Sequence, residues 1–215
     1  MNVTQGSSFL VCGPSNSGKT TLVSQILRNR QLLFDKQAPA VFLFYTQSQP
    51  CYDELLKEGI ITNKFEGYPS YETVKKLAMP FKKLGGSIAI FDDQLSGLSN
   101  DIVRIFQELV HHANMTTFYL TQNLFHSDAR HRSLSLNASY LILTKNPRDR
   151  SQIVHLAKQF SPYHASYLIH SYLEASKKMY GYLILDCTQT CPDMIRVRSR
   201  ILPHENPIEV YIEKS

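Results

Sequence analysis

The chain has 215 residues, 43% of them hydrophobic, which is enough for one sizeable core without a disulfide or a structural metal. Lys and Arg number 23 against 18 Asp and Glu, giving a net charge of +5 that suits a polyanionic partner without requiring one. No apolar run is long enough to span a membrane and the polar start lacks signal-peptide features, so we expect no membrane partner and no secretion.

Six short apolar runs that do not alternate with polar residues predict strands buried on both faces of a sheet. In chain order they cover residues 8–12, 40–45, 87–91, 117–120, 140–143 and 182–185. Helical spacing of apolar residues marks segments 20–30, 101–112, 149–159 and 164–178. Strands that alternate with helices predict a three-layer α/β fold around a mostly parallel sheet.

Two stretches fit this alternation less well. Residues 49–80 contain three prolines and are expected to combine short helices with loops. Residues 187–215 follow the last strand and carry three more prolines around two expected strands, 195–202 and 208–212. We therefore predict a main domain over residues 1–186 and a C-terminal β extension, packed on the same domain or on a neighbouring chain.

The segment GPSNSGKT, residues 13–20, matches the P-loop pattern GxxxxGK[ST] at every fixed position, after a strand and before a helix. Its glycines allow the backbone to wrap around phosphates with amide groups pointing inward, and the helix adds its N-terminal dipole. Lys19 is expected to reach the β- and γ-phosphates, and the Thr20 hydroxyl to bind Mg²⁺. The expected nucleotide-binding residues are Gly13, Pro14, Ser15, Asn16, Ser17, Gly18, Lys19, Thr20 and Thr21.

A second motif is the apolar strand that ends in Asp92 and Asp93, which has the form of a Walker B motif. Asp92 is predicted to hold Mg²⁺ and Asp93 to polarise the attacking water. Many ATPases of this kind have Glu at the second position, and Asp is shorter by one methylene. Since a misplacement of about 1 Å can cost on the order of a hundredfold in rate, the loop must be built around Asp93 or another group must position the water.

A third polar strand end follows in the segment FYLTQN, residues 118–123. If this strand lies between the P-loop strand and the Walker B strand, Gln122 or Asn123 ends near the γ-phosphate. We favour Gln122 as the residue that senses this phosphate or orients the water.

Phosphoryl transfer commonly gains about 10³ to 10⁵ from an arginine finger, which a neighbouring subunit can supply. Arg130 and Arg132 are the first candidates, Arg148 and Arg150 the second, and Arg104 the third. No sequence rule decides among them, and each is individually more typical of a surface or DNA contact. The basic excess is concentrated between residues 130 and 200, which a solvated face explains as well as a polyanion partner.

The order GPSNSGKT, IAIFDDQ, FYLTQN in a short basic chain resembles the FtsK/HerA-type DNA-packaging ATPases, above all those of poxviruses, Polinton/Maverick elements and adintoviruses. The resemblance implies an additional-strand (ASCE) P-loop fold and a homo-oligomeric ring, a hexamer, that pulls duplex DNA into a viral capsid or portal vertex using ATP and Mg²⁺. It implies nonspecific contacts to DNA phosphates and a place inside an infected host cell, in nucleus or cytoplasm, or in the virion. By position, it gives Lys19, Thr20, Asp92, Asp93 and Gln122 the roles described above.

Two other functions stay open at the level of sequence. A small nucleoside or nucleotide kinase would need an acceptor-binding carboxylate after the second strand, where Asp53 and Glu54 lie. A nucleotide-gated DNA-binding scaffold with little hydrolysis is compatible with Asp at the catalytic-base position. A GTPase is disfavoured because Lys145-Asn146-Pro147 is not a guanine-reading NKxD motif.

Overall fold

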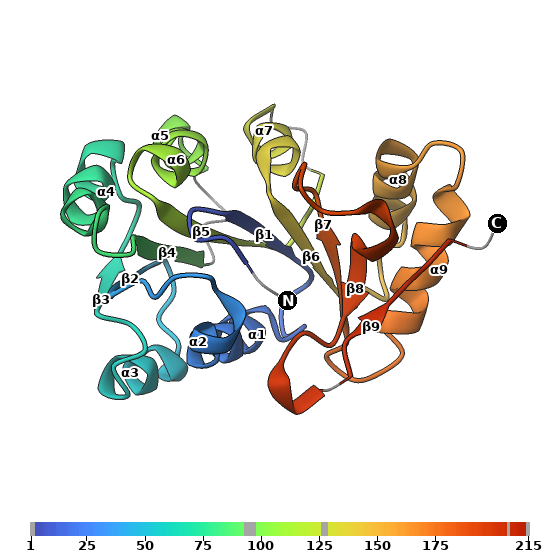
Figure 1. Cartoon of the computed structure of the whole chain (residues 1–215), viewed down its shortest axis with the longest axis horizontal. Helices are drawn as coiled ribbons and strands as arrows, with labels where there is room; N and C mark the ends of the chain where they lie inside the picture. Colours follow the sequence, from blue (N-terminus) through green and yellow to red (C-terminus); the bar gives the residue numbers. More distant parts are fainter. Residues whose placement is uncertain (1–2, 93–97, 126–128, 206, 214–215) are drawn as a thin grey trace.

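The computed structural model describes residues 3–92, 98–125, 129–205 and 207–213, and within these residues nine strands form one mixed sheet. Their order is β3-β2-β4-β5-β1-β6-β7-β8-β9 (Figure 1). The strands are β1 Ser8–Cys12, β2 Ala40–Tyr45, β3 Asn63–Glu66, β4 Ser87–Asp92, β5 Met115–Thr121, β6 Tyr140–Thr144, β7 Tyr182–Asp186, β8 Val197–Ser199 and β9 Glu209–Val210.

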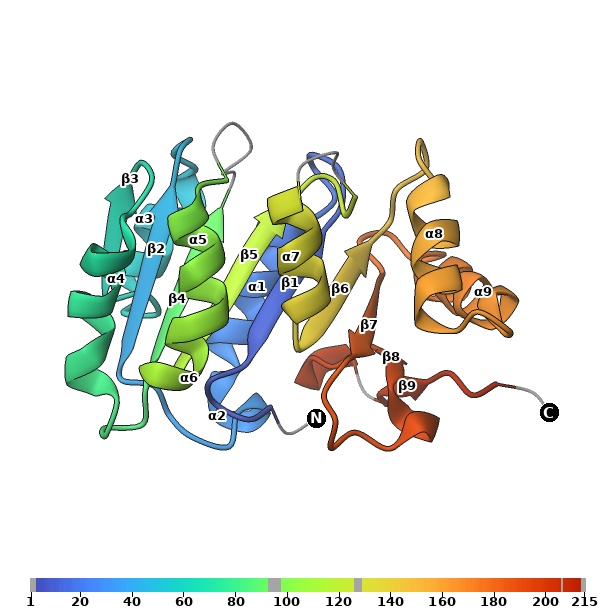
Figure 2. The same cartoon turned by 90° about the horizontal axis from the view of Figure 1, so that it is seen from above.

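Strands β1 to β6 pair with one another in parallel, whereas the pairs β6–β7, β7–β8 and β8–β9 are antiparallel. The predicted α/β fold with a mostly parallel sheet and antiparallel C-terminal strands is therefore confirmed. Strand β5 lies between β1 and β4, pairing Ser8 with Thr117 on one side and Met115 with Ser87 on the other. The carboxyl ends of these three strands consequently meet at one edge of the sheet, the upper edge in Figure 2.

Helices cover both faces of the sheet (Figure 1). One face carries α1 Lys19–Arg28, α2 Arg30–Leu33 and α3 Pro50–Lys57. The other carries α4 Tyr71–Ala78, α5 Asn100–Arg104, α6 Val110–His112, α7 Ala129–Asn137 and α8 Ser151–Phe160, with α9 Ala165–Ala175 beside α8. A π-helical segment, Ile105–Leu109, joins α5 to α6, and short 3₁₀ turns cover Met79–Phe81, Asp193–Ile195 and Pro203–Glu205.

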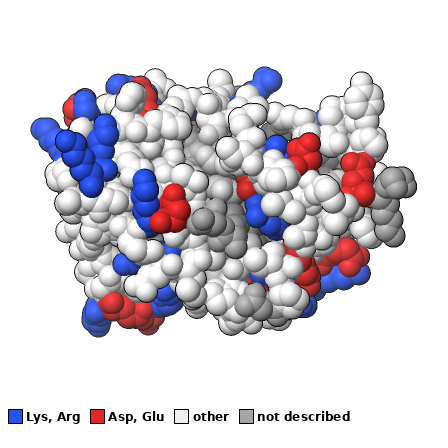
Figure 3. All heavy atoms as spheres, viewed as in Figure 1, with Lys and Arg blue, Asp and Glu red and all other residues white. Residues whose placement is uncertain are grey.

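The basic excess between residues 130 and 200 is partly neutralised by acidic neighbours. In the described part of the chain, ion pairs join Lys177 to Glu174, Arg196 to Asp193, Arg198 to Asp186 and Arg200 to Glu209. On the face shown in Figure 3, basic and acidic groups lie side by side in several places, and basic side chains also gather over the edge where α4 lies. The charge distribution alone therefore does not mark one basic face.

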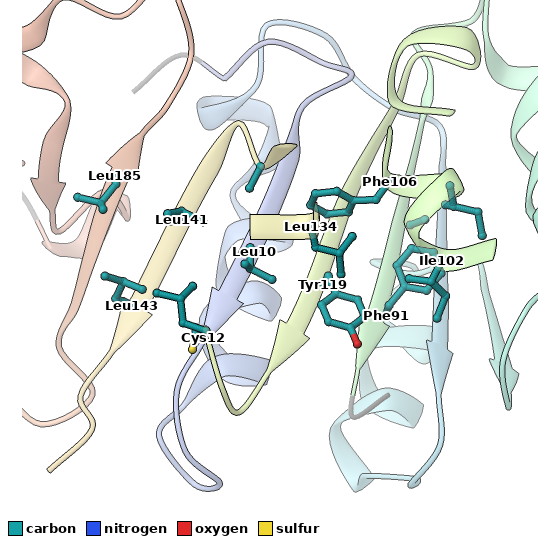
Figure 4. Packing of buried hydrophobic residues seen from close by; sticks show 14 of the residues in the cluster. Leu10, Cys12, Phe91, Ile102, Phe106, Tyr119, Leu134, Leu141, Leu143 and Leu185 are labelled. Carbon is teal, nitrogen blue, oxygen red and sulfur yellow. The ribbon is translucent and has the colours of Figure 1, made fainter. Parts of the chain in front are cut away.

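Alternate residues of the central strands enter two separate hydrophobic layers. Leu10 and Cys12 of β1 pack under α5–α8 with Phe91, Tyr119 and other apolar side chains (Figure 4). Phe9 points to the opposite layer, where its ring stacks on Phe118 at 4.5 Å. Since both faces of each strand are covered, the strands read as unbroken apolar runs.

Residues 187–213, as far as they are described, pack on the sheet of their own chain. Strand β8 pairs antiparallel with β7, and β9 pairs with β8. Ile201 and Leu202 then enter the apolar layer on the α1 side of the sheet. The division at residue 186 stays a prediction, but the segment after β8 reaches the face that carries the P-loop helix (Figure 1).

Candidate nucleotide-binding site

A cavity of about 1080 Å³ opens where β1, β4 and β5 end. The P-loop residues from Ser15 to Thr21 line it, together with Asp92 and Gln122. Three motifs that lie far apart in the sequence thus meet at one edge of the sheet (Figure 2). Gly13 and Pro14 are not among the residues lining the cavity; the Gly13 amide donates to the Thr121 carbonyl and anchors the loop to β5.

The P-loop backbone needs glycine for two different reasons. Gly18 has a φ of +88°, in the left-handed region that other residues rarely adopt. At Gly13 the reason is space, because a Cβ there would lie 1.8 Å from Thr144 Oγ1. The same hydroxyl lies 2.7 Å from Ser17 Oγ and 3.2 Å from the Cys12 carbonyl oxygen, so the end of β6 holds the loop in shape.

Lys19 and the start of α1 concentrate positive charge beside the cavity. Lys19 Nζ donates to the carbonyl oxygens of Gly13 (2.7 Å) and Pro14 (3.0 Å), which folds the ammonium over the loop. Gly18 offers α1 no side-chain cap, and the first turn has no acidic residue. The N-terminal amide groups and the dipole of this helix are therefore available to bind an anion. Burial raises the pKa of the preceding Cys12 thiol to about 12, so this thiol stays protonated.

Asp92 lies at the end of β4 with 3% of its surface exposed. Its Oδ2 accepts hydrogen bonds from Thr20 Oγ1 and from the Tyr52 hydroxyl, each at 2.8 Å. Hydroxyl and carboxylate oxygens are the hard donors that Mg²⁺ takes, and Mg²⁺ commonly uses only one or two protein ligands. The pair of Thr20 and Asp92 therefore fits the predicted magnesium site.

Tyr52 is a site residue that the sequence analysis missed. It lies on α3 with 1% of its surface exposed, and its hydroxyl reaches Asp92 across 40 residues of chain. No motif marks it. The indication of its place comes from the order of the elements: α3 follows β2, and β2 pairs along its whole length with β4, the strand that ends in Asp92.

Gln122, just beyond β5, lines the cavity, whereas its neighbour Asn123 does not. The loop that follows is held by a buried glutamine on α8, Gln152, which was also missed. Gln152 Oε1 accepts from the Leu124 amide at 2.7 Å, and its Nε2 donates to Asp149 Oδ2 at 2.7 Å. The exit of β5 is thereby tied to the start of α8.

The remaining catalytic predictions are Asp93 and the candidate arginines. Asp93 falls outside the described residues. Arg130 and Arg132 lie exposed on α7, and neither lines the cavity. Arg148 and Arg150 are exposed between β6 and α8, and neither of them lines the cavity.

Arg104, the third finger candidate, belongs to a cluster on the far face of the sheet. Its guanidinium lies 4.0 Å from the centre of the Tyr71 ring, and its Nε is 3.1 Å from Glu108 Oε1. It does not line the cavity either. None of the five arginines named as candidates lines the cavity of its own chain.

No protein-family model matches the chain, and no curated protein matches it in sequence. Solved structures, however, match it in fold. The genome-packaging NTPase B204 of Sulfolobus turreted icosahedral virus 2, in complex with AMPPCP, superposes with a TM-score of 0.59 at 12% identity over 97% of this chain and 98% of its own. Its complex with ATP-γS gives a TM-score of 0.57 at 11% identity over 98% and 99% of the two chains.

The DNA-packaging ATPase B204 of Sulfolobus turreted icosahedral virus superposes with a TM-score of 0.57 at 14% identity over 99% and 100% of the two chains. The chain has the fold of these NTPases. At identities this low the likeness establishes the fold and not the activity.

Proposed function

We propose that this protein is an ATPase that drives duplex DNA into a viral capsid. The observation that carries the proposal is the meeting of Lys19, Thr20, Asp92 and Gln122 at one cavity, in a fold shared over nearly the full length with viral packaging NTPases. The finer assignment to the FtsK/HerA type rests on the motif order in the sequence.

In this proposal the chain's own residues bind and orient the nucleotide. The α1 amides and Lys19 hold the β- and γ-phosphates, and Thr20 and Asp92 hold Mg²⁺ with Tyr52 fixing the carboxylate. Bound Mg²⁺ would neutralise charge on the phosphate oxygens. Gln122 faces the γ-phosphate, and Asp93 accepts the proton of the attacking water.

An arginine from a neighbouring subunit completes the site, because none of the candidate arginines lines the cavity of its own chain. A shared site of this kind needs at least a second copy of the chain, and we propose a homo-oligomeric ring, a hexamer, working in an infected cell. None of the helices in the described residues has the length and apolar character of a membrane-spanning segment.

The kinase alternative finds no support in the carboxylates it needs. Asp53 is exposed on α3 and pairs with Lys64, and Glu54 is exposed beside it. Neither residue lines the cavity.

The test is ATP turnover by the full chain with Mg²⁺, with and without duplex DNA. We expect DNA to stimulate hydrolysis, and Lys19→Ala to lower it by about 10² to 10³, the loss that follows removal of one preorganised charge-stabilising donor. Lys83→Ala is the matched control, since Lys83 is exposed and far from the cavity lining.

Asp93→Asn should abolish turnover while ATP still binds. Phosphate transfer to a nucleoside would instead support a kinase. ATP binding without hydrolysis in the wild type would support the scaffold.

A further inference from the structure

The loop between α9 and β7 holds a tyrosine in an unfavourable backbone conformation. Tyr180 has a φ of +58°, a left-handed conformation that costs free energy for a bulky side chain. Its side chain gains little from packing in return, because 62% of its surface is exposed. Strained backbone of this kind persists where the surrounding structure holds it, and it gathers at ligand sites.

Tyr180 lies against the P-loop. Its Cδ1 is 3.0 Å from the position that a Cβ on Gly18 would take, and its Cγ is 3.5 Å from the same point. Tyr180 also lines the cavity that Lys19 and Thr21 line. The left-handed backbone thus presents an aromatic ring beside the phosphate-binding loop.

The wall next to this ring is built by the segment that follows β8. Leu202, His204 and Glu205 line the cavity there, and so does Tyr182 of β7. The Tyr182 hydroxyl donates to the Glu205 carboxylate and accepts from the Ile201 amide at 3.0 Å. Burial, more than the Glu205 contact, raises the pKa of Tyr182, so its hydroxyl keeps its proton and holds the wall in place.

A triphosphate bound at the P-loop does not account for the whole cavity. The cavity volume of about 1080 Å³ is slightly above the range of roughly 300–1,000 Å³ that is typical of small-molecule sites. Besides the phosphate-binding groups, part of the cavity lining comes from Leu22, Tyr180, Tyr182, Leu202 and His204, with Glu205 bonded to Tyr182. That part suits a sugar and a planar base.

We propose that Tyr180 is the platform on which the base of the bound nucleotide stacks, with the segment at residues 201–205 as the adjoining wall. The inference rests on the proposed function and adds to it the part of the site that holds the nucleoside. A stacked ring accepts the π-face of any base, so Tyr180 contributes affinity for nucleoside triphosphates as a class.

Tyr180 is not the most exposed tyrosine of the described residues. Tyr163 is 94% exposed, but it lies between α8 and α9 and does not line the cavity. Tyr180 differs in its backbone conformation, its contact with Gly18 and its place in the cavity lining.

The test compares two ligands, ATP and inorganic tripolyphosphate, titrated with Mg²⁺ into the full chain in a calorimeter. Tyr180→Gly removes the ring and suits the positive φ, so it avoids added strain. Tyr180→Phe keeps the ring, and Met179→Ala alters an exposed neighbour that does not line the cavity.

We expect Tyr180→Gly to weaken ATP binding about tenfold, as loss of one base stack does, with tripolyphosphate binding unchanged. Tyr180→Phe and Met179→Ala should bind both ligands like the wild type. Equal losses for both ligands would mean that the ring supports the P-loop, and no loss for ATP would mean that it does not touch the base; either result overturns the inference. A wild type that binds neither ligand, or a Lys19→Ala variant that binds both unchanged, would instead refute the proposed function.

Discussion

The carboxylate of Asp92 depends on hydroxyl groups from two different parts of the chain. Thr20 belongs to the P-loop and Tyr52 to the helix after the second strand, and both donate to the same oxygen at 2.8 Å. With one oxygen bonded in this way, the carboxyl group has a fixed orientation toward the cavity. In the proposed function Tyr52 is a positioning residue, because it would act on Mg²⁺ through Asp92.

Tyr52→Phe removes this hydroxyl and keeps the ring in the core. We expect the Mg²⁺ concentration for half-maximal hydrolysis to rise about 10- to 100-fold, the usual effect of losing a partner of a metal ligand. A hydrogen bond to a charged group is also lost, at about 1.5–3 kcal/mol in the free energy of unfolding. A Mg²⁺ titration of ATP turnover measures the first effect, and denaturant unfolding measures the second.

Tyr45→Phe is the control, since the Tyr45 ring lies 5.2 Å from the Tyr52 ring and its change leaves the Tyr52–Asp92 bond intact. An unchanged Mg²⁺ requirement in Tyr52→Phe, with Tyr45→Phe also unchanged, would show that Tyr52 serves the core alone.

At this scale the sequence predicted the residues that belong to local motifs. Lys19, Thr20 and Asp92 could be placed together because the carboxyl ends of parallel strands meet at one edge. Tyr52 and Tyr180 could not, because their roles depend on contacts across 40 residues or more and on a backbone conformation that no motif encodes.

Among the elements, the strands were predicted best, because burial on both faces leaves an unbroken apolar run. Helix α7 was missed because only His131 and Leu134 of its nine residues are buried, which gives no helical stripe. Strand β3, at the edge of the sheet, was missed because none of its residues is fully buried. The C-terminal strands are shorter than predicted; Arg200, with a φ of +57°, directly follows β8 where the predicted strand would continue to residue 202.

Helix α8 and the exit of β5 form one unit through Gln152. Replacing this residue by Leu leaves the buried Leu124 amide without its acceptor, which should cost about 1–3 kcal/mol in the free energy of unfolding. Because Gln122 precedes this loop, we expect kcat for ATP to fall while KM stays close to its original value. Gln159→Leu on the exposed side of the same helix is the control.

The same variant has a second readout in Asp149. Hydrogen bonds from Ser151, and to a smaller extent from Gln152, lower the pKa of this carboxyl group. The hydrogen-bonded carboxylate therefore contributes to the stability of the fold above the ordinary pKa, and this contribution is lost as the pH falls through the lowered pKa. Gln152→Leu should move the Asp149 pKa upward in an NMR titration. A loss of stability with kcat and the Asp149 pKa unchanged would limit Gln152 to a packing role.

At the scale of the whole molecule, the proposed function predicts a surface that binds duplex DNA. Ion pairs neutralise Lys177, Arg196, Arg198 and Arg200 within the chain. The loop between β6 and α8 differs, because Lys145, Arg148 and Arg150 are all exposed there, at the same edge of the sheet as the cavity. We therefore propose this loop as the DNA contact.

Replacing Lys145, Arg148 and Arg150 together by Ala should weaken duplex binding and reduce the slope of log affinity against log salt by up to about 3, since each lost phosphate contact removes about 0.9. The control replaces Lys76, Lys82 and Lys83, three exposed lysines at the α4 edge. Both variants remove three charges, so a general electrostatic effect would change both equally and would contradict this placement. ATP turnover without DNA tests the same loop for an arginine finger. A loss of turnover confined to the first variant would favour Arg148 or Arg150 as the finger. Neither arginine lines the cavity of its own chain, so it would have to act on the nucleotide of a neighbouring subunit.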